Sequence, residues 1–512
     1  MRRLTLLALL LGCDPSKGTE TGTSPVDTGG PDSSTDDSSP DSGADSDTSG
    51  DSDSAGDSAD SGAWDCEALP ELPVEDDQYL GFTSAEDFAF TADGQVLAVD
   101  GYGNLVETTI DGTETLLRPG IGTVAGTRIL PGGDVVVANY GVGEVQRISL
   151  TDGSVSTLVS GLPYPNGLDI GLDGMIYVAD TTLGQVLKID PDTGESSVVA
   201  EGMYSPNGVA VSVDGETLYI GSFGGGTVYA ISRVGEGFER PRIYGTTPDS
   251  PGVPTDDCPD LAEGDECMLT SGTGVGNCAS DDDGLYCTLQ RDEAACEGLA
   301  EGDPCSSTLF GEPVESLCVT DGGGALFCPR TEGSRVSACD GKTAYQRCNF
   351  DGERGYCYPS WEGENVCMGD SEYMTLYEEG CEGLDIGEEC MLNLPSGAMA
   401  GVCSDGSAYG FDGAACLPPY WTSMSGGLDG IGVDACGQVY VAEYISGKLM
   451  RFAAEGSDAE LVARLRSSWI PNLHWGVGAG GFERDVLYVA DRTNAGIFGV
   501  YVGVGGRPEL YP

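Results

Sequence analysis

Four oxygen-bearing residues recur at one phase of a repeat of about forty residues. They are Glu86, Asn166, Asn207 and Asp429, and each precedes a short apolar run of the kind seen at 176–180. A repeat that presents the same position once per unit points that position at a common axis, so we expect the four side chains to converge. Carboxylate and amide oxygens are the ligands that hard cations prefer, and the pattern therefore predicts a site for Ca²⁺ or another divalent cation.

The predicted ligand set carries two negative charges, which balance one divalent ion. It contains neither cysteine nor histidine, and this favours Ca²⁺, Mg²⁺ or Mn²⁺ over Zn²⁺. Such an ion can polarise a carbonyl or phosphoryl oxygen and lower the pKa of a bound water. We assign Asp429 a second, catalytic role as base or nucleophile. Asn166 and Asn207 lie in Pro-Asn-Gly tripeptides, so structural turns are the alternative for those two residues.

The repeat itself predicts the fold. Its units begin near residues 86, 125, 166, 207, 429 and 472. Each unit shows an alternating run, an Asp-Gly type turn, a Val/Tyr/Ala run and two further short strands, such as 185–189 and 197–200. Four-stranded units at this period are typical of propeller blades, so we predict an all-β chain with a six-bladed β-propeller. An open β-solenoid fits less well, because the copies stop at six and none resembles a polar cap.

The distribution of these residues resembles a known family. Ligands in units one, three, four and five, with Ala125 at the same phase of unit two, are similar to the metal constellation of the gluconolactonase-like family. That family includes regucalcin (senescence marker protein) and luciferin-regenerating enzyme. Residues 428–443 resemble its fifth blade, 471–474 the start of blade six in the fluorophosphatase branch, and 496–508 the gluconolactonase C-terminus. The resemblance implies metal-dependent hydrolysis of a lactone or related ester.

The chain departs from that family at specific positions. Sugar-lactone members carry an Arg where this chain has Tyr164, which argues against a gluconate-type substrate. The fluorophosphatase branch holds a second calcium with a carboxylate where this chain has Gly432, although His474 remains. His474 is the sole histidine, and we expect it to be a packed, hydrogen-bonded side chain beside Trp475. Nucleophilic triads are poorly supported with one histidine.

The N-terminus predicts export. Arg2 and Arg3 precede an apolar run that is too short to span a membrane and ends at Cys13, in a pattern that resembles a bacterial lipobox. We expect residues 1–13 to be a lipoprotein signal peptide with Cys13 acylated; an ordinary signal peptide is the alternative. Residues 14–63 are rich in Asp, Ser, Gly and Thr and predict a disordered acidic tether. The expected location is the bacterial cell envelope, facing the periplasm or the cell surface.

The charge balance limits the partners. The chain holds 23 basic and 84 acidic residues, for a net charge of −61. Nucleic acid is excluded, because phosphate contacts need basic residues. We expect contact with the membrane through the lipid anchor only, and a monomer. The ligand would be a small lactone or ester, or alternatively a protein or glycan bound by a propeller without catalytic activity.

Cysteines mark an insertion within the repeat. Of 19 cysteines, sixteen fall into four groups of four with similar spacing. They are Cys258, Cys267, Cys278 and Cys287; Cys296, Cys305, Cys318 and Cys328; Cys339, Cys348, Cys357 and Cys367; Cys381, Cys390, Cys403 and Cys416. The absence of histidine and of C-x-x-C in this region disfavours zinc, so we predict two disulfides per group, with the pairing open. We predict that the remaining pair, Cys66 and Cys436, forms a further disulfide.

These features divide the chain into five parts. After the signal peptide and tether come blades one to four (64–250), the Cys-rich insertion (251–425) and blades five and six (426–512). The insertion leaves and returns on the face where the predicted ligands lie. It could act as a lid, a recognition surface or a docking module, or it could be a tolerated insertion with no role in the site.

Overall fold

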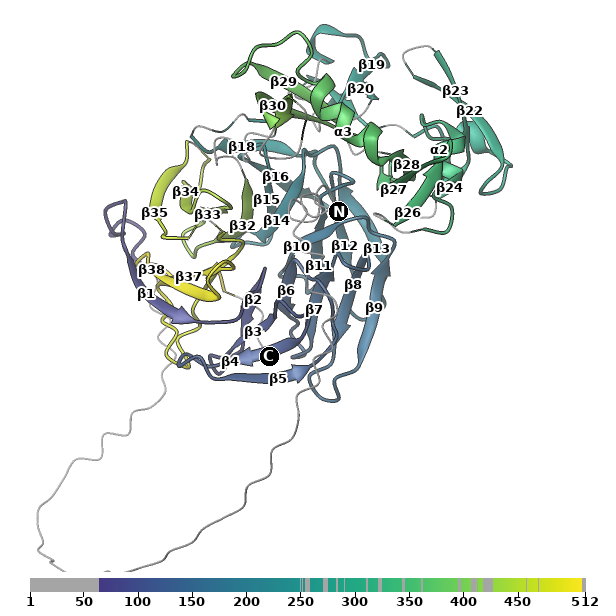
Figure 1. Ribbon diagram of the computed structural model, residues 1–512. Helices are drawn as coiled ribbons and strands as arrows, with labels where there is room; N and C mark the ends of the chain where they lie inside the picture. The colour runs from purple at the N-terminus through teal and green to yellow at the C-terminus, as the bar shows by residue number, and fades with distance from the viewer. Residues whose placement is uncertain are drawn as a thin grey trace, which may run out of the picture. The chain divides into compact units, whose positions relative to one another are not determined.

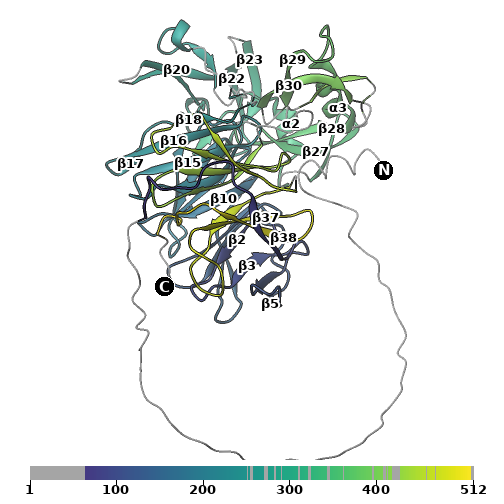
Figure 2. The same cartoon turned by 90° about the vertical axis from the view of Figure 1, so that its left-hand side faces the viewer.

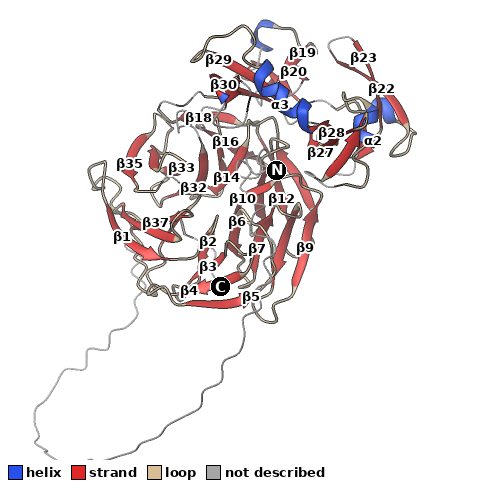
Figure 3. Cartoon of the chain, in the orientation of Figure 1, coloured by secondary structure: helices blue, strands red, loops and turns tan. Residues whose placement is uncertain are grey.

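The computed structural model describes residues 64–508, apart from 249, 251, 254–257, 270–274, 282–283, 290, 310–311, 321–324, 343–345, 361, 395–396, 407–410, 412, 418–426, 457 and 468. The predicted signal peptide, Cys13 and the predicted tether lie outside the described residues. The described part is almost entirely β, and its two α-helices, α2 (Gly333–Ser337) and α3 (Asp370–Glu379), lie among the strands of the Cys-rich segment (Figure 3). No helix in this part is long and apolar enough to cross a membrane.

Six antiparallel sheets of similar build account for most of the described strands, and we number them in chain order (Figure 1). Sheet 1 contains β2 (Phe88–Phe90), β3 (Val96–Val99), β4 (Leu105–Thr108) and β5 (Glu114–Arg118). Sheet 2 contains β6 (Gly126–Ile129), β7 (Val135–Asn139), β8 (Glu144–Ile148) and β9 (Val155–Ser160). Sheet 3 contains β10 (Pro165–Ile170), β11 (Ile176–Asp180), β12 (Gln185–Ile189) and β13 (Ser196–Ala200).

Sheets 4 to 6 have the same build, except that sheet 4 has a fifth strand and sheet 6 takes one of its four strands from the start of the described chain. Sheet 4 contains β14 (Pro206–Val211), β15 (Thr217–Ser222), β16 (Thr227–Val234), β17 (Gly237–Phe238) and β18 (Arg242–Thr246). Sheet 5 contains β32 (Leu428–Val433), β33 (Val439–Glu443), β34 (Lys448–Phe452) and β35 (Glu460–Arg464). Sheet 6 contains β36 (Leu473–Trp475), β37 (Val486–Asp491) and β38 (Gly496–Tyr501), and its fourth strand is β1 (Asp76–Gly81) from the start of the described chain.

The hydrophobic core lies between successive sheets. Leu130, Val136 and Ala138 of sheet 2 pack with Leu168 and Val178 of sheet 3 in one buried cluster. Equivalent clusters join sheets 1 and 2, 3 and 4, 4 and 5, 5 and 6, and 6 and 1. The first strands of the six sheets contact one another in the same cyclic order. Each sheet therefore buries both of its faces against neighbours, which explains why the repeats have near-continuous apolar runs.

The segment between β18 and β32 forms small separate sheets. Its strands are β19 (Glu266–Met268), β20 (Val275–Asp281), β21 (Gly284–Thr288), β22 (Pro304–Leu309), β23 (Glu312–Leu317), β24 (Val319–Thr320), β25 (Leu326–Phe327), β26 (Arg347–Phe350), β27 (Glu353–Pro359), β28 (Asn365–Gly369), β29 (Glu389–Leu394), β30 (Gly397–Asp405) and β31 (Ala414–Leu417). Figure 2 shows α3 beside β27 and β28 of this segment. Cystines form most of the buried clusters of the first three modules, because units this small cannot build a large apolar core.

Each of the four groups of four cysteines marks one module of the Cys-rich segment. The disulfide connectivity is the same in all four modules: the first cysteine pairs with the third and the second with the fourth. The pairs are Cys258–Cys278, Cys267–Cys287, Cys296–Cys318, Cys305–Cys328, Cys339–Cys357, Cys348–Cys367, Cys381–Cys403 and Cys390–Cys416. The close grouping of these sulfur atoms thus reflects cystines rather than thiolate metal ligands. A ninth disulfide joins Cys66 to Cys436, with 5.8 Å between their Cα atoms.

Candidate functional site

Three of the four predicted ligands occupy the same place in their sheets. Asn166 lies in β10, Asn207 in β14 and Asp429 in β32, each as the second residue of the first strand. In each case the pairing with the second strand shifts register at this point, which is the mark of a β-bulge. Bulges re-aim side chains and are common beside active sites. All three residues are buried, at 6% exposure.

Glycines after the three bulges bring the ligand positions close together. A Cβ on Gly167 would lie 2.7 Å from the carbonyl oxygen of Asn207, and one on Gly208 would lie 2.3 Å from that of Asp429. Because only hydrogen fits there, the backbone of each bulge packs directly against the next one around the centre. The structure therefore places Asn166, Asn207 and Asp429 on three consecutive sheets at one level.

Glu86, the fourth predicted ligand, precedes β2 and forms an ion pair with Arg492. Arg492 follows β37 in sheet 6, and both side chains are mostly buried, at 17% exposure for Glu86 and 20% for Arg492. The charges of both Glu86 and Arg492 act on Asp429, which shows that the two carboxylates and the guanidinium share one cluster. We refer to Glu86, Asn166, Asn207 and Asp429 as the ligand ring.

Sequence reasoning missed Arg492. The residue follows the second strand of its sheet, where the other repeats have Gly101, Tyr140, Thr181, Phe223 and Tyr444. Two of these positions contact the ligand ring: Arg492 pairs with Glu86, and Thr181 Oγ1 accepts a hydrogen bond from Asn166 Nδ2 at 3.0 Å. Alignment of the repeats at the position after each second strand could therefore have identified a further residue of the site. Arg492 is the one charged residue among the six residues at that position.

Burial sets the electrostatics of the ligand ring. It raises the pKa of Asp429 well above the ordinary range, and repulsion from Glu86 adds to the effect. Arg492 and a hydrogen bond from the Asn207 amide act on that pKa in the opposite direction. Burial also raises the pKa of Glu86, against the attraction of Arg492. Two buried carboxylates with one guanidinium leave a negative charge that a proton or a cation must balance.

Aromatic side chains form two stacked pairs, and one of them includes Tyr444, which lies close enough to Glu86 and Asp429 to interact with their charges. Tyr140 stacks on Tyr164, with ring centroids 4.8 Å apart, and Tyr444 stacks on Trp469 at 5.8 Å. Phe223 packs against Tyr444 at 5.9 Å. Burial raises the pKa of the Tyr444 hydroxyl, and Glu86 reinforces that shift. Aromatic side chains such as these are suited to contact the apolar or aromatic part of a bound molecule.

The donor chemistry of the ligand ring fits a hard divalent cation. Its donors are carboxylates and amide oxygens, and the Asn166 amide nitrogen is engaged by Thr181, which leaves the amide oxygen for a cation. The raised pKa values of Glu86 and Asp429 reflect chiefly burial, which disfavours their charged forms, and a divalent ion would favour those forms. Arg492 supplies part of that charge and is the competitor of such an ion for Glu86.

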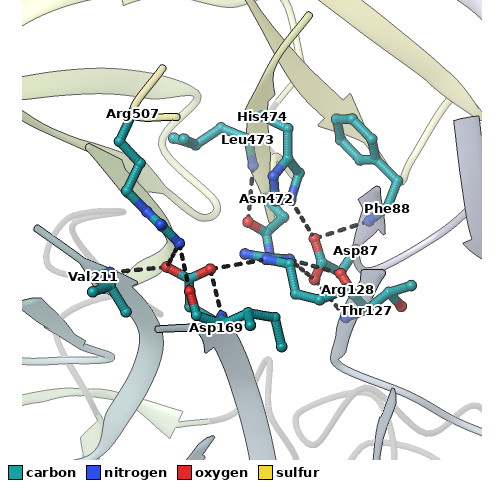
Figure 4. A network of polar contacts seen from close by, with 11 residues as sticks. Asp87, Phe88, Thr127, Arg128, Asp169, Val211, Asn472, Leu473, His474 and Arg507 are labelled. Atoms are coloured by element: carbon teal, nitrogen blue, oxygen red, sulfur yellow. Dashed lines mark hydrogen bonds and ion pairs between the residues drawn. The ribbon is translucent and has the colours of Figure 1, made fainter. Parts of the chain in front are cut away.

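A second polar layer lies further along the same first strands (Figure 4). Asp87 Oδ2 accepts hydrogen bonds from the backbone NH of Thr127 at 2.7 Å and from Arg128 Nη1 at 2.8 Å. Asp169 pairs with Arg507 at 2.7 Å and lies 3.6 Å from Arg128. Despite complete burial, the pKa of each aspartate is lowered, chiefly by Arg128 for Asp87 and by Arg507 for Asp169.

His474 belongs to this second layer. Its Nε2 lies 2.9 Å from Asp87 Oδ1, and its ring meets Phe88 edge-on at 4.9 Å. These contacts agree with the packed, hydrogen-bonded role expected for the sole histidine. A Cβ on Gly432 would lie 2.8 Å from the Trp475 ring, which explains why no larger side chain occupies that position.

Comparisons with known proteins returned structural likeness only. No protein-family model matches the chain, and no curated protein matches it. Luciferin-regenerating enzyme is similar over 86% of this chain and 98% of its own, at 12% identity and a TM-score of 0.42. Virginiamycin B lyase from Staphylococcus aureus is similar over 83% and 98%, at 12% identity and a TM-score of 0.37.

A gluconolactonase from Xanthomonas campestris has a higher identity over a shorter span. It is 24% identical over 42% of this chain and 78% of its own, with a TM-score of 0.30. Because these three TM-scores lie below 0.5, the likenesses establish neither a shared family nor a shared activity.

Proposed function

We propose that the six sheets are the blades of a closed six-bladed β-propeller, and that the ligand ring is the active centre of a divalent-metal-dependent hydrolase. The substrate class is a lactone or related ester. The observation that carries this proposal is the shared electrostatic cluster of Glu86, Asp429 and Arg492, with Asn207 hydrogen-bonded to Asp429. Asn166 occupies the same strand position as Asn207 and Asp429, which supports a cation site built from oxygen donors of several blades.

Each residue of the ring has a distinct task in this proposal. Glu86, Asn166, Asn207 and Asp429 would hold the ion, which when bound supplies polarisation of a carbonyl oxygen and activation of water. Asp429 would also serve as the base that accepts a proton from the attacking water. Arg492 can donate hydrogen bonds to an oxygen on which negative charge develops. The aromatic residues around the ring would hold the apolar part of the substrate and limit the access of bulk water.

Calcium calorimetry on the fragment from residue 64 onward tests the proposal. We expect one ion to bind per chain, and Asp429→Asn to abolish that binding because it removes an anionic donor. Asp152→Asn is the matched control, since Asp152 is fully exposed in a turn of sheet 2. Turnover of a panel of lactones and aryl esters, with and without chelator, follows on the same proteins. Absence of calcium binding, or equal binding by Asp429→Asn, would remove the metal-dependent hydrolase.

A second candidate function is ligand binding without catalysis. The Glu86–Arg492 ion pair favours it, because the centre can neutralise part of its own charge without a metal ion. The ligand would then be a protein or a glycan, and the stacked pairs Tyr140–Tyr164 and Tyr444–Trp469 would form the contact surface. Binding of a glycan that is unaffected by chelator, with no hydrolysis of lactones or esters, would establish this function in place of the first.

We further propose that the chain is an exported lipoprotein anchored through Cys13. Nine disulfides within the described residues support an oxidising compartment. Metabolic labelling with a palmitate analogue in a bacterial host should tag the wild-type chain and not Cys13→Ser. Equal labelling of the two proteins would contradict the anchor.

A further inference from the structure

A cavity of about 390 Å³ lies next to the second polar layer. Its lining includes Trp64, Arg128, Asp169, His474, Arg484 and Arg507. It also includes Val433 and Trp475, which end β32 and β36, whereas Asp429 lies at the start of β32. The cavity is thus at the opposite ends of the first strands from the ligand ring, and it plays no part in the function proposed above.

The charge of this cavity is opposite to that of the chain. The whole chain has 84 acidic against 23 basic residues, yet the cavity wall has three arginines and a single carboxylate, that of Asp169. Within the second layer, Arg128 and Arg507 are balanced by Asp87 and Asp169. Arg484 adds a positive charge at the exposed edge, where its Nε donates to the carbonyl oxygen of Val477. One further negative charge would neutralise the set.

Arg507 carries an unsatisfied donor. Its Nη2 donates to Asp169 Oδ2 at 2.7 Å and to the carbonyl oxygen of Ile170 at 3.0 Å. The Arg507 side chain is 8% exposed, and its Nη1 is buried without a hydrogen-bond partner among the described residues. A buried guanidinium NH without an acceptor is costly, and natural structures nearly always satisfy it. An acceptor supplied by a ligand would complete the site.

We propose that this cavity binds a small organic monocarboxylate. The carboxylate would accept from Arg507 Nη1, because a guanidinium and a carboxylate form short, charge-assisted hydrogen bonds. Arg484 would attract and orient the anion from the edge. Trp64 and Trp475 supply flat apolar walls for the rest of the molecule, and the volume suits a ligand of the size of a substituted aromatic acid.

Calorimetric titration of the fragment from residue 64 with benzoate tests the site, and neutral benzamide is the isosteric control. We expect benzoate to bind with a stoichiometry of one and benzamide to bind at least about tenfold more weakly, since only the anion compensates the arginines. Arg484→Gln should weaken benzoate binding by about tenfold; Arg484 is exposed, so this variant leaves the core intact.

Arg507→Lys keeps the charge and the pairing with Asp169 but lacks the Nη1 donor, so it should weaken benzoate more than benzamide. Asp429→Asn should leave benzoate binding unchanged, which separates this site from the ligand ring. The proposal is overturned if benzoate shows no saturable binding, if benzamide binds equally well, or if Arg484→Gln and Arg507→Lys both bind benzoate as the wild type does.

Discussion

The guanidinium of Arg492, which follows the second strand of sheet 6, forms an ion pair with the carboxylate of Glu86, which precedes the first strand of sheet 1. The pair connects sheet 1 with sheet 6, the first and the last of the six sheets in chain order. It also places a fixed positive charge inside a cluster whose other charged members are acidic. An ion entering the ligand ring must therefore share Glu86 with Arg492 or displace it.

Removal of this arginine should strengthen cation binding. For Arg492→Gln we expect calcium affinity to rise by at least about tenfold, because a like charge beside the ion is lost in a poorly solvated site. Calcium calorimetry of the wild type and the variant at one pH measures the effect. Arg484→Gln is the matched control, since it makes the same charge change in the connection between β36 and β37, away from the ligand ring. Weaker calcium binding by Arg492→Gln would instead mean that the arginine holds Glu86 in place for the ion.

A methyl group at Gly208 should force adjacent sheets apart. Gly208→Ala would place Cβ 2.3 Å from the Asp429 carbonyl oxygen, which is backbone and cannot move away cheaply. We expect a loss of about 1–3 kcal/mol in the free energy of unfolding, as overpacking of a tight interior typically causes. Urea unfolding measures it, with Gly132→Ala as control because that site has no atom within 4 Å. Equal stability of the two variants would show that the bulges can separate without cost.

The pH dependence of stability should contain a contribution from Asp180. Burial raises the pKa of its carboxyl from 3.8 to about 6 at the end of β11. The folded state therefore holds the proton more tightly than the unfolded chain, so the stability contribution is complete below pH 3.8 and is lost as the pH rises through about 6. The loss amounts to about 3 kcal/mol, at 1.36 kcal/mol per pKa unit.

Asp180→Asn removes that titration and tests its sign. The stability of the variant relative to the wild type should improve by about 3 kcal/mol between pH 3.5 and pH 8, because only the wild type loses a favourable proton. Denaturant unfolding of both proteins across this range gives the difference. A constant difference between them would mean that the pKa of the Asp180 carboxyl is the same in the folded and the unfolded chain.

The Cys66–Cys436 disulfide should stabilise the fold more than a disulfide within a module. It joins residues 370 apart, whereas Cys258–Cys278 closes a separation of 20. In the chain-entropy account, loss of the long loop costs about 6 kcal/mol and loss of the short one about 3 kcal/mol. Paired Cys→Ser variants at each disulfide, compared by urea midpoint under oxidising conditions, measure both. An equal or smaller effect for Cys66–Cys436 would contradict the ranking.

Much of the strand pattern could be read from the repeat. The predicted runs 176–180, 185–189 and 439–443 coincide with β11, β12 and β33, because each is a short apolar segment between turn residues that buries both faces. In the sequence, the bulges at Asn166 and Asn207 are indicated only by the tripeptide Pro-Asn-Gly. This tripeptide is equally typical of an ordinary turn, so it does not by itself predict that the Asn side chain is redirected by a bulge.

What could not be read depends on contacts between distant segments. β1 has little apolar alternation of its own, and its partner β38 lies at the far end of the chain, so no local pattern reveals the pairing. Arg492 replaces residues of other types in the remaining repeats and therefore looks like an irregularity rather than a signal. The balance of Arg128 and Arg507 against Asp87 and Asp169 is set by packing across sheets, which spacing along one strand does not encode.

The pairing of β1 with β38 has a consequence for how the chain must be made. Sheet 6 takes its outer strand from residues 76–81 and its neighbouring strand from residues 496–501, so the sheet stays incomplete until residues 496–501 have been delivered. A chain that emerges N-terminus first, from a ribosome or through a translocation pore, cannot complete sheet 6 while residues 496–501 are still enclosed. Sheet 6 is therefore assembled late, and only in the compartment that both of its segments have reached.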